Sequence, residues 1–321
     1  MNTAAIVVEN LSVGYGRGRG SGGRSFGDRG ASTVLDGLSL TIPAGQTFAL
    51  LGRNGAGKTT LIRTLLGLLE PAAGRVEVLG VNPTTQPLVV RSRIGYLAED
   101  QSMYPGMTAD ELAAFLAPFY PTWDAALARD LFQQFGVPTG VRIKQLSKGH
   151  TVRLGLALAL AHRPELVILD DPAMGLDPIT RKQFNRDVVE HLQAEGRTVF
   201  YSSHLLYEVE AVADAVAILD GGRLVRVGTT EAVQNDVKRV LVSGDVLLAG
   251  PKPEKLLDVT RRGDRLAVTL DGAPAWIERL DAAEADYAVE DLSLDEIFEA
   301  FVIGQTELWP DRSAGVTAVV K

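Results

Sequence analysis

The sequence predicts an α/β fold with a largely parallel core sheet, followed by a small α+β domain. Apolar segments with strand character alternate with helical segments over residues 1–230, and this alternation is typical of parallel sheets covered by helices. Beyond residue 230, strand segments and a closing helix follow without that alternation. We therefore expect a large domain over residues 1–230, a small domain over 231–305 and a tail over 306–321.

Strands of the large domain are expected where β-branched and apolar residues gather between turn signals. These segments cover residues 5–8, 38–42, 47–52, 94–99, 166–170, 198–203 and 215–220. Helical periodicity begins at residue 60, in TLIRTLLGLL, and again fills residues 108–136. The segment 16–30 holds seven glycines and four arginines, so we interpret it as a flexible surface loop.

In the small domain, residues 237–250 and 265–272 have strand character. A helix is expected over residues 293–302, because Ser293 and Glu296 have the spacing of a capping box. One face of this helix is apolar and carries Leu294, Ile297, Phe298 and Phe301.

Composition and charge exclude several classes of protein. The chain has no cysteine, which excludes disulfides, thiolate zinc sites and cysteine-ligated iron–sulfur clusters. The net charge of −8 argues against a protein that coats nucleic acid, so no nucleic-acid partner is expected. MNTAAIVVEN has no basic start followed by an apolar run, so no secretory signal is expected. The most apolar stretch, residues 154–161, is too short to cross a bilayer.

The strongest functional pattern is a phosphate-binding loop. Residues 52–60 read GRNGAGKTT, after a buried strand and before a helix, which is the context of a P-loop. Its glycines let backbone N–H groups surround the phosphates, and the positive end of the helix points at them. We expect Lys58 to reach the β- and γ-phosphates of a nucleotide and Thr59 to hold Mg²⁺. The expected nucleotide contacts are Gly52, Arg53, Asn54, Gly55, Ala56, Gly57, Lys58, Thr59 and Thr60.

A pair of carboxylates follows a second buried strand, in LVILDDP at residues 166–172. Asp170, at the strand end, is expected to hold Mg²⁺ through water. Asp171 is expected to point toward the γ-phosphate as the catalytic base or water-orienting group. Together with the P-loop, these residues predict a site that binds a nucleotide with Mg²⁺ and activates water; the P-loop alone is shared by kinases, GTPases and many motors.

Further motifs resemble those of the ATP-binding-cassette (ABC) ATPases, in the order and spacing of that family. LSKGH at residues 146–150 resembles the signature motif LSGGQ, and GLDP at 175–178 resembles the D-loop. IGYLAE at 94–99 lies where the family has its Q-loop, and SSHLLYEVE at 202–210 matches its switch region. The resemblance covers residues 5–230. It implies a P-loop NTPase cassette with a mixed sheet core and a helical subdomain at residues 100–165.

The resemblance implies a role for each matching residue. Tyr15 would stack on adenine, and His204 would be the switch histidine of the catalytic site. Glu99 would act in catalysis and contact Mg²⁺, and Asp177 would contact nucleotide as part of the D-loop.

The resemblance also implies partners. Two cassettes would pair head to tail as a homo- or heterodimer, so that Ser147 and Gly149 of one contact the ATP held by the other. The region 100–145 would pass the resulting movement to a transmembrane permease subunit. This places the chain in the cytoplasm, peripheral on the cytoplasmic face of the cell membrane. Its last domain resembles the accessory segment of cassettes from ABC-2-type exporters, which favours export over import.

Three positions depart from the family pattern and leave alternatives open. Asp171 stands where the family has Glu, so its carboxylate reaches less far and we expect slow but real hydrolysis. Glu99 replaces the Q-loop Gln and cannot donate a hydrogen bond. In the signature, Lys148 adds a cation and His150 keeps a donor. A regulatory subunit that binds ATP and barely hydrolyses it, or an ABC ATPase without a transport function, are the alternative interpretations.

Overall fold

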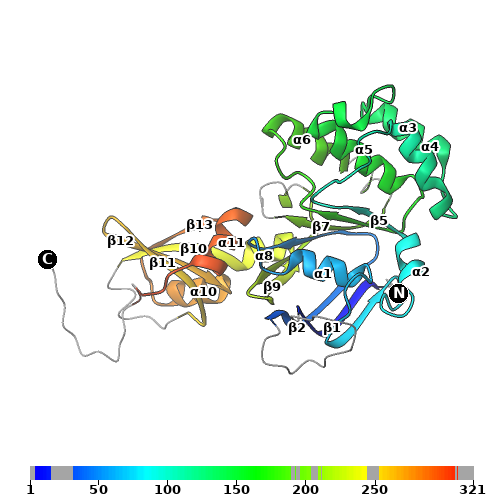
Figure 1. Cartoon of the computed structure of the whole chain (residues 1–321). Helices are drawn as coiled ribbons and strands as arrows, with labels where there is room; N and C mark the ends of the chain where they lie inside the picture. The colour runs from blue at the N-terminus through cyan, green and yellow to red at the C-terminus, as the bar shows by residue number, and fades with distance from the viewer. Residues whose placement is uncertain are drawn as a thin grey trace. The chain divides into compact units, whose positions relative to one another are not determined.

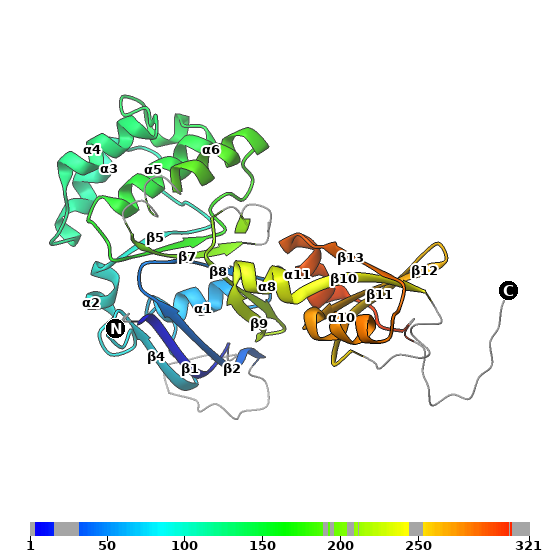
Figure 2. The same ribbon diagram turned by 180° about the vertical axis from the view of Figure 1, so that it is seen from behind.

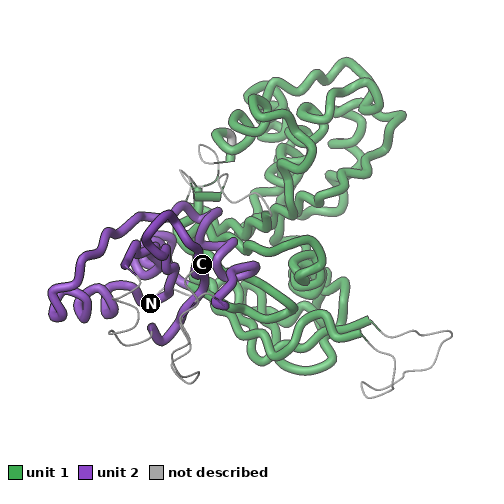
Figure 3. Tube along the Cα trace, turned by 90° about the vertical axis from the view of Figure 1, so that its left-hand side faces the viewer, with its two compact units in different colours: residues 1–227 green, residues 228–321 purple. Residues whose placement is uncertain are grey.

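The computed structural model describes residues 4–15, 32–188, 192, 196–203, 209–210, 212–243, 253–307 and 309. The predicted loop 16–30 and the predicted switch residue His204 lie outside these described residues. The chain divides into two compact units, residues 1–227 and 228–321, drawn in different colours in Figure 3. The boundary predicted from sequence lay at residue 230.

A six-stranded sheet forms the centre of the first unit. In spatial order its strands are β5 (Ile94–Leu97), β6 (Leu166–Asp170), β7 (Thr198–Ser203), β3 (Thr47–Leu51), β8 (Ala215–Asp220) and β9 (Arg223–Thr229). The first five are mutually parallel, which confirms the predicted core sheet. Strands β3, β6 and β7 are buried along their whole length, as expected for a parallel sheet covered on both faces.

A second, antiparallel sheet lies on one side of helix α1 (Lys58–Leu65). Its spatial order is β2 (Ser32–Pro43), β1 (Ala4–Tyr15) and β4 (Ala73–Val78). Apolar residues of α1, of this sheet and of one face of the six-stranded sheet form a single core. Figures 1 and 2 show α1 between the two sheets from opposite sides of the molecule.

The remaining helices of the first unit include a group on the other face of the six-stranded sheet (Figure 1). The helices are α2 (Pro87–Ser92), α3 (Ala109–Leu116), α4 (Ala125–Gln134), α5 (Lys148–Leu160) and α6 (Pro178–Val188), with short 3₁₀ turns at Ala117–Phe119 and Ile143–Gln145. The helical periodicity predicted over 108–136 corresponds to two helices, α3 and α4. A capping box of Thr108 and Glu111 begins α3, and the Asp124 carboxylate caps α4 by accepting from two backbone N–H groups.

His162 joins α5, the segment before α4 and the first residue of β5. Its side chain is only 1% exposed. Nε2 donates a hydrogen bond of 3.1 Å to the Ile94 carbonyl oxygen, and the ring stacks on Tyr120 with centroids 4.1 Å apart. Burial lowers the pKa of His162 to about 4, against the partial opposition of the Ile94 hydrogen bond, and the Arg197 charge lowers it further. The histidine is therefore neutral in the folded protein at neutral pH.

This buried histidine makes stability depend on pH. The unfolded chain protonates His162 near its ordinary pKa of 6.5, well above the folded value of about 4. The free energy of unfolding is therefore unaffected by His162 above pH 6.5. It falls as the pH is lowered from 6.5 toward 4, by about 3 kcal/mol in total. Urea unfolding at pH 7.5, 6 and 5 measures the part of this loss that is complete by pH 5, about 2 kcal/mol. His162→Phe keeps an aromatic stack on Tyr120 and should show a flatter dependence over the same range; equal slopes for the two proteins would contradict the assignment.

The second unit has its own sheet and core. Its spatial strand order is β11 (Lys255–Arg262), β12 (Arg265–Asp271), β10 (Val237–Ser243) and β13 (Tyr287–Asp291), all antiparallel. Its helices are α8 (Thr230–Asp236), α10 (Ala273–Ala282) and α11 (Leu294–Ile303). The predicted capping box of Ser293 and Glu296 is confirmed at the start of α11. Trp309, in the predicted tail, packs edge-on against Trp276 of α10 and belongs to this core.

No helix within the described part of the chain is both long and apolar enough to cross a membrane.

Candidate nucleotide site

The P-loop connects the central strand β3 to helix α1. Gly57 precedes the helix with a φ of 113°, a conformation that favours glycine, and an added Cβ would lie only 2.6 Å from Leu35 Cδ2. Gly55 has a φ of 85°. Arg53, Asn54 and Gly55 are exposed at the loop tip, whereas the later residues turn inward. The loop therefore presents its backbone at the N-terminus of α1, where partial positive charge favours an anion.

Lys58 is buried at the base of this loop, with 6% exposure. Its ammonium donates a hydrogen bond of 2.8 Å to the carbonyl oxygen of Gly52. The same nitrogen lies 3.5 Å from Asp171 Oδ2. A cation is thus held between the loop backbone and one of the two predicted carboxylates, although 113 positions separate Lys58 from Asp171.

Asp170 is held by hydroxyl groups from two other elements. Oδ1 accepts a 2.7 Å hydrogen bond from Ser202 Oγ on β7 and a 3.5 Å hydrogen bond from Thr59 Oγ1 on α1. Burial raises the pKa of Asp170, against the opposing effect of these two hydrogen bonds. The predicted pairing of Thr59 with Asp170 brings together the two oxygen groups expected to hold the metal.

Asp171 follows directly and adopts a left-handed backbone, with a φ of 43°. Aspartate tolerates this region better than most residues do. Its backbone N–H donates to the Ser202 carbonyl oxygen at 3.0 Å and to Ser202 Oγ at 3.3 Å. The turn directs the Asp171 carboxylate back toward Lys58. Ser202 therefore holds the carboxylate of Asp170 and the backbone of Asp171. The sequence did not reveal this role because it depends on the register of β6 with β7.

Tyr15 and Glu99 belong to different sheets of the first unit: Tyr15 ends β1, and Glu99 follows β5. Tyr15 is 44% exposed and has its hydroxyl 3.4 Å from Thr60 Oγ1. Glu99 is exposed, two residues after the end of β5. Because β5 is parallel to β6 and Leu97 pairs with Leu169, Glu99 and Asp170 follow neighbouring strands at the same edge of the sheet.

Oxygen groups suited to Mg²⁺ are present, but carboxylates alone do not enclose it. Among the described residues no three His, Cys, Asp or Glu side chains gather as a metal site. A buried carboxylate beside a threonine hydroxyl fits a hard cation that keeps several waters and takes further oxygens from a nucleotide.

The signature residues begin helix α5. Ser147 is its N-cap, and its hydroxyl accepts from the His150 N–H at 3.2 Å and lies 3.0 Å from His150 Nδ1. Lys148 extends over the D-loop, so that an added Cβ at Gly175 would lie 2.3 Å from its Nζ. The variant residues of LSKGH thus contact the signature itself and the neighbouring loop.

The D-loop packs against the signature of the same chain. The Asp177 carboxylate begins α6 and accepts hydrogen bonds from the N–H groups of Ile179 and Thr180 and, at 2.6 Å, from Thr180 Oγ1. These hydrogen bonds, chiefly the one from the Thr180 hydroxyl, lower the pKa of Asp177. A Cβ at Gly149 would lie 2.6 Å from Thr180 Cγ2. Glycine at position 149 therefore permits the close approach of α5 to α6.

The structure brings the predicted residues together in two groups. The P-loop, both carboxylates and Tyr15 form one group, and Ser147, Gly149 and Asp177 form the other. A division of this kind fits a site that needs a second cassette to supply the signature.

Comparisons with known proteins bear on the family of this chain. The model of the family described as ABC transporter matches residues 35–174. The ABC transporter ATP-binding protein NatA of Bacillus subtilis is 35% identical over 202 residues, covering 61% of this chain and 82% of NatA. The Nod factor export ATP-binding protein I of Neorhizobium galegae is 34% identical over 210 residues, covering 64% of this chain and 60% of that protein.

A solved ATP-binding subunit of an ABC transporter superimposes with a TM-score of 0.61 at 27% sequence identity, covering 72% of this chain and 92% of its own. The chain spans 62–64% of the length of three relatives that are 35–38% identical to it. On the similarity to NatA, the match to the family model and the P-loop geometry, the chain belongs to the ATP-binding proteins of the ABC transporter family.

Proposed function

We propose that this chain binds ATP with Mg²⁺ and hydrolyses it to power transport by a separate transmembrane subunit. The observation that carries the proposal is the convergence of Lys58, Thr59, Asp170 and Asp171 at one end of the central sheet. Family membership supports ATP as the nucleotide, and no span of sufficient length occurs in the described helices. The membrane-crossing part would then belong to a partner.

Each residue has a distinct part in the proposed reaction. Lys58 would exchange its contact with Gly52 for the β- and γ-phosphate oxygens. Asp170 and Thr59 would hold Mg²⁺, which supplies positive charge to the phosphate oxygens when bound. Asp171 would orient the attacking water and accept its proton, since its carboxylate lies beside Lys58 at the phosphate end of the loop.

A second cassette would complete the site. The N-terminus of α5 carries Ser147 and Gly149, and its partial positive charge suits the γ-phosphate of ATP bound by the partner cassette. ATP would thus favour the closed pair and hydrolysis would release it. The links from Lys148 and Thr180 mean that signature and D-loop approach the partner together.

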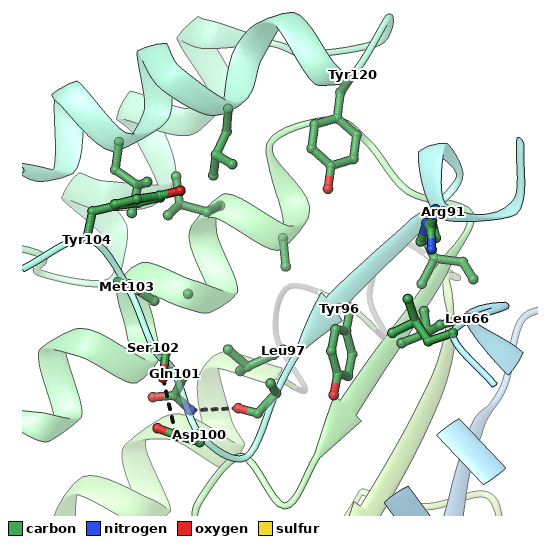
Figure 4. A pocket seen from close by; sticks show the side chains of 18 residues that line it. Leu66, Arg91, Tyr96, Leu97, Asp100, Gln101, Ser102, Met103, Tyr104 and Tyr120 are labelled. Carbon is green, nitrogen blue, oxygen red and sulfur yellow. Dashed lines mark hydrogen bonds between the residues drawn. The ribbon is translucent and has the colours of Figure 1, made fainter. Parts of the chain in front are cut away.

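A groove in the first unit is the proposed contact with the transmembrane subunit (Figure 4). The groove has a volume of about 370 Å³ and lies between β5, the segment after it, and helices α3 and α5. Its walls are largely apolar, with Asp100, Gln101 and Ser102 at one end. Beside it, Tyr104, Phe115 and Phe119 stack edge to face although 54%, 41% and 65% exposed. Exposed clustered aromatics of this kind mark interaction surfaces.

The proposal is tested with the membrane subunit present. Phe119→Asp is expected to reduce co-purification from detergent-solubilised membranes by about tenfold or more, because it places a charge on the aromatic surface. ATP affinity of the isolated chain should stay within about threefold of the wild type, since Phe119 belongs to neither group of the nucleotide site. The measurement is the ratio of the two subunits recovered on a tagged membrane partner.

Val225→Asp is the matched control. Val225 is 42% exposed and lies on β9, at the other edge of the sheet from β5. It should leave co-purification unchanged. If Phe119→Asp co-purifies with the membrane subunit as well as the wild-type chain does, the groove is not the docking site. Failure of the wild-type chain to associate with membranes at all would favour an ABC ATPase without a transport function.

We place the chain on the cytoplasmic face of the cell membrane, and we propose export as its direction. The relatives named for Nod factor export and for linearmycin resistance support export. The second unit supports it more weakly, through its resemblance to the accessory segment of exporter cassettes. ATP-dependent uptake of the cargo into inverted membrane vesicles would demonstrate export.

A further inference from the structure

One side chain inside the signature, that of His150, is hydrogen-bonded to the hydroxyl of Ser147. Ser147 is exposed at the start of α5, and His150 is half-buried three residues further along the helix. The Ser147 Oγ accepts a hydrogen bond from the His150 N–H at 3.2 Å and lies 3.0 Å from Nδ1 of the same residue. The backbone and the ring of His150 therefore both engage this one hydroxyl.

The ring contact decides where the Ser147 proton goes, because a serine hydroxyl has one proton to donate and two lone pairs that accept. The His150 N–H occupies one lone pair of the Ser147 Oγ. If Nδ1 carries no hydrogen, it accepts the Ser147 proton, and only a lone pair of Oγ is left for a ligand. If Nδ1 carries a hydrogen, it donates to the second lone pair, and the Ser147 proton is left for a ligand.

The proposed ligand of the signature selects between these two forms. In the proposed pair of cassettes, Ser147 meets the γ-phosphate of ATP bound by the other cassette, and phosphate oxygens accept hydrogen bonds. A lone pair of Ser147 directed at such an oxygen would repel it, whereas the Ser147 proton would donate a charge-assisted hydrogen bond. The phosphate therefore favours the form of His150 that carries a hydrogen on Nδ1.

The neighbouring polar side chains make different contacts. The Thr151 hydroxyl donates to the carbonyl oxygen of Ser147 at 3.1 Å and leaves Oγ untouched. Lys148 extends over Gly175 of the D-loop. Among the described residues of this first turn of α5, the His150 side chain is thus the one that contacts the Ser147 hydroxyl.

We infer that His150 is a positioning residue for the phosphate contact of the signature: its Nδ1–H donates to the Ser147 oxygen and thereby directs the Ser147 proton toward the γ-phosphate held by a partner cassette. The inference rests on the proposed function, because it takes a second cassette as the source of that phosphate. His150 is not a catalytic residue, since its effect reaches the nucleotide only through Ser147.

The test compares side chains that keep or lose a donor at the position of Nδ1. The measurement is the ATPase rate of the full-length chain in the complex purified on the tagged membrane subunit. His150→Ala is expected to lower kcat by about tenfold or more, because the Ser147 proton is no longer directed at the phosphate. His150→Asn places an amide nitrogen near the position of Nδ1 and should keep the rate within about threefold of the wild type. His150→Gln places its amide further out, near the position of Nε2, and should resemble His150→Ala.

A double-mutant cycle with Ser147 separates this role from a general loss of structure. Ser147→Gly removes the hydroxyl and keeps a residue type that caps helices acceptably. In this background His150→Ala should lower the rate no further, because no hydroxyl is left to direct. Thr151→Val is the matched control, since it removes a hydroxyl bonded to the Ser147 carbonyl oxygen, and it should leave the rate unchanged.

Two further measurements should not move in the His150 variants. ATP affinity of the isolated chain should match the wild type, because the signature would contact the ATP of another cassette. The midpoint of thermal unfolding should also match, because the backbone N–H of residue 150 still donates to Ser147.

A rate for His150→Ala equal to that of the wild type would overturn the inference. Full additivity in the cycle would do the same, as would a His150→Asn variant as slow as His150→Ala. If the wild-type complex hydrolyses no ATP, the proposed function itself fails. If the wild-type complex hydrolyses ATP and the His150 variants behave as it does, only the role of His150 fails.

Discussion

Replacement of Asp171 by asparagine is expected to slow ATP hydrolysis by about a thousandfold while ATP affinity changes by less than about threefold. Asparagine has nearly the same shape, so it keeps the left-handed turn at φ 43° and the two hydrogen bonds from the backbone N–H to Ser202. It removes the charge beside Lys58 and the ability to accept a proton from water. Phosphate release in single-turnover experiments measures the rate, and equilibrium titration with ATP measures the affinity.

Asp171→Glu tests the same position in the opposite direction. The added methylene carries the carboxylate about 1.5 Å further toward the attacking water, so hydrolysis is expected to rise by about tenfold. Glutamate tolerates the left-handed region less well than aspartate, so backbone strain is expected to reduce part of this gain in rate. A Glu variant no faster than the wild type would show that reach does not limit the rate. A wild-type rate equal to that of Asp171→Asn would favour the regulatory, ATP-binding interpretation.

Lys58→Ala is expected to weaken ATP binding by about a hundredfold or more. The ammonium is buried, donates to the Gly52 carbonyl oxygen and lies 3.5 Å from Asp171. Its removal deletes the cation that would meet the phosphates and leaves Asp171 without this charge partner. Isothermal titration with ATP, in Mg²⁺ and in EDTA, measures the loss.

The control for Lys58 is Lys144→Ala, which removes the same charge from an exposed position in a 3₁₀ turn. It should bind ATP as the wild type does. Circular dichroism of both variants checks that the fold is kept. Binding by Lys58→Ala within about threefold of the wild type would contradict the assignment of the P-loop lysine.

Much of the nucleotide site could be predicted from the sequence because its signals are local. The strand, the glycine turn and the helix of the P-loop follow one another within residues 47–65, and each has its own composition. The pair of carboxylates is also a local signal, because it directly follows the second buried strand in the sequence. No local pattern encodes their convergence on Lys58 and Thr59; it was expected because both motifs were assigned to one nucleotide and its Mg²⁺.

Other features depend on long-range register and were not predictable. Strand β4 has only two buried residues, Val76 and Val78, so its pattern is too weak to distinguish from a loop. The contacts of Ser202 with the Asp170 carboxylate and the Asp171 backbone could be foreseen only by knowing that β7 lies beside β6. The contacts of His162 join three separate segments, and Trp309 reaches its partner Trp276 from a tail without periodicity.

Helix α5 has a mechanical consequence that follows from its length. Ser147 begins it, Gly155 and Leu158 form part of the groove floor, and His162 is fixed just beyond its end. Its 13 residues make a rod of about 20 Å, so a tilt of about 10° about the His162 end would move Ser147 by about 3 Å. That displacement equals the length of a hydrogen bond. A displacement imposed at the middle of such a rod is therefore larger at Ser147, the residue that would contact the γ-phosphate of ATP bound by the partner cassette.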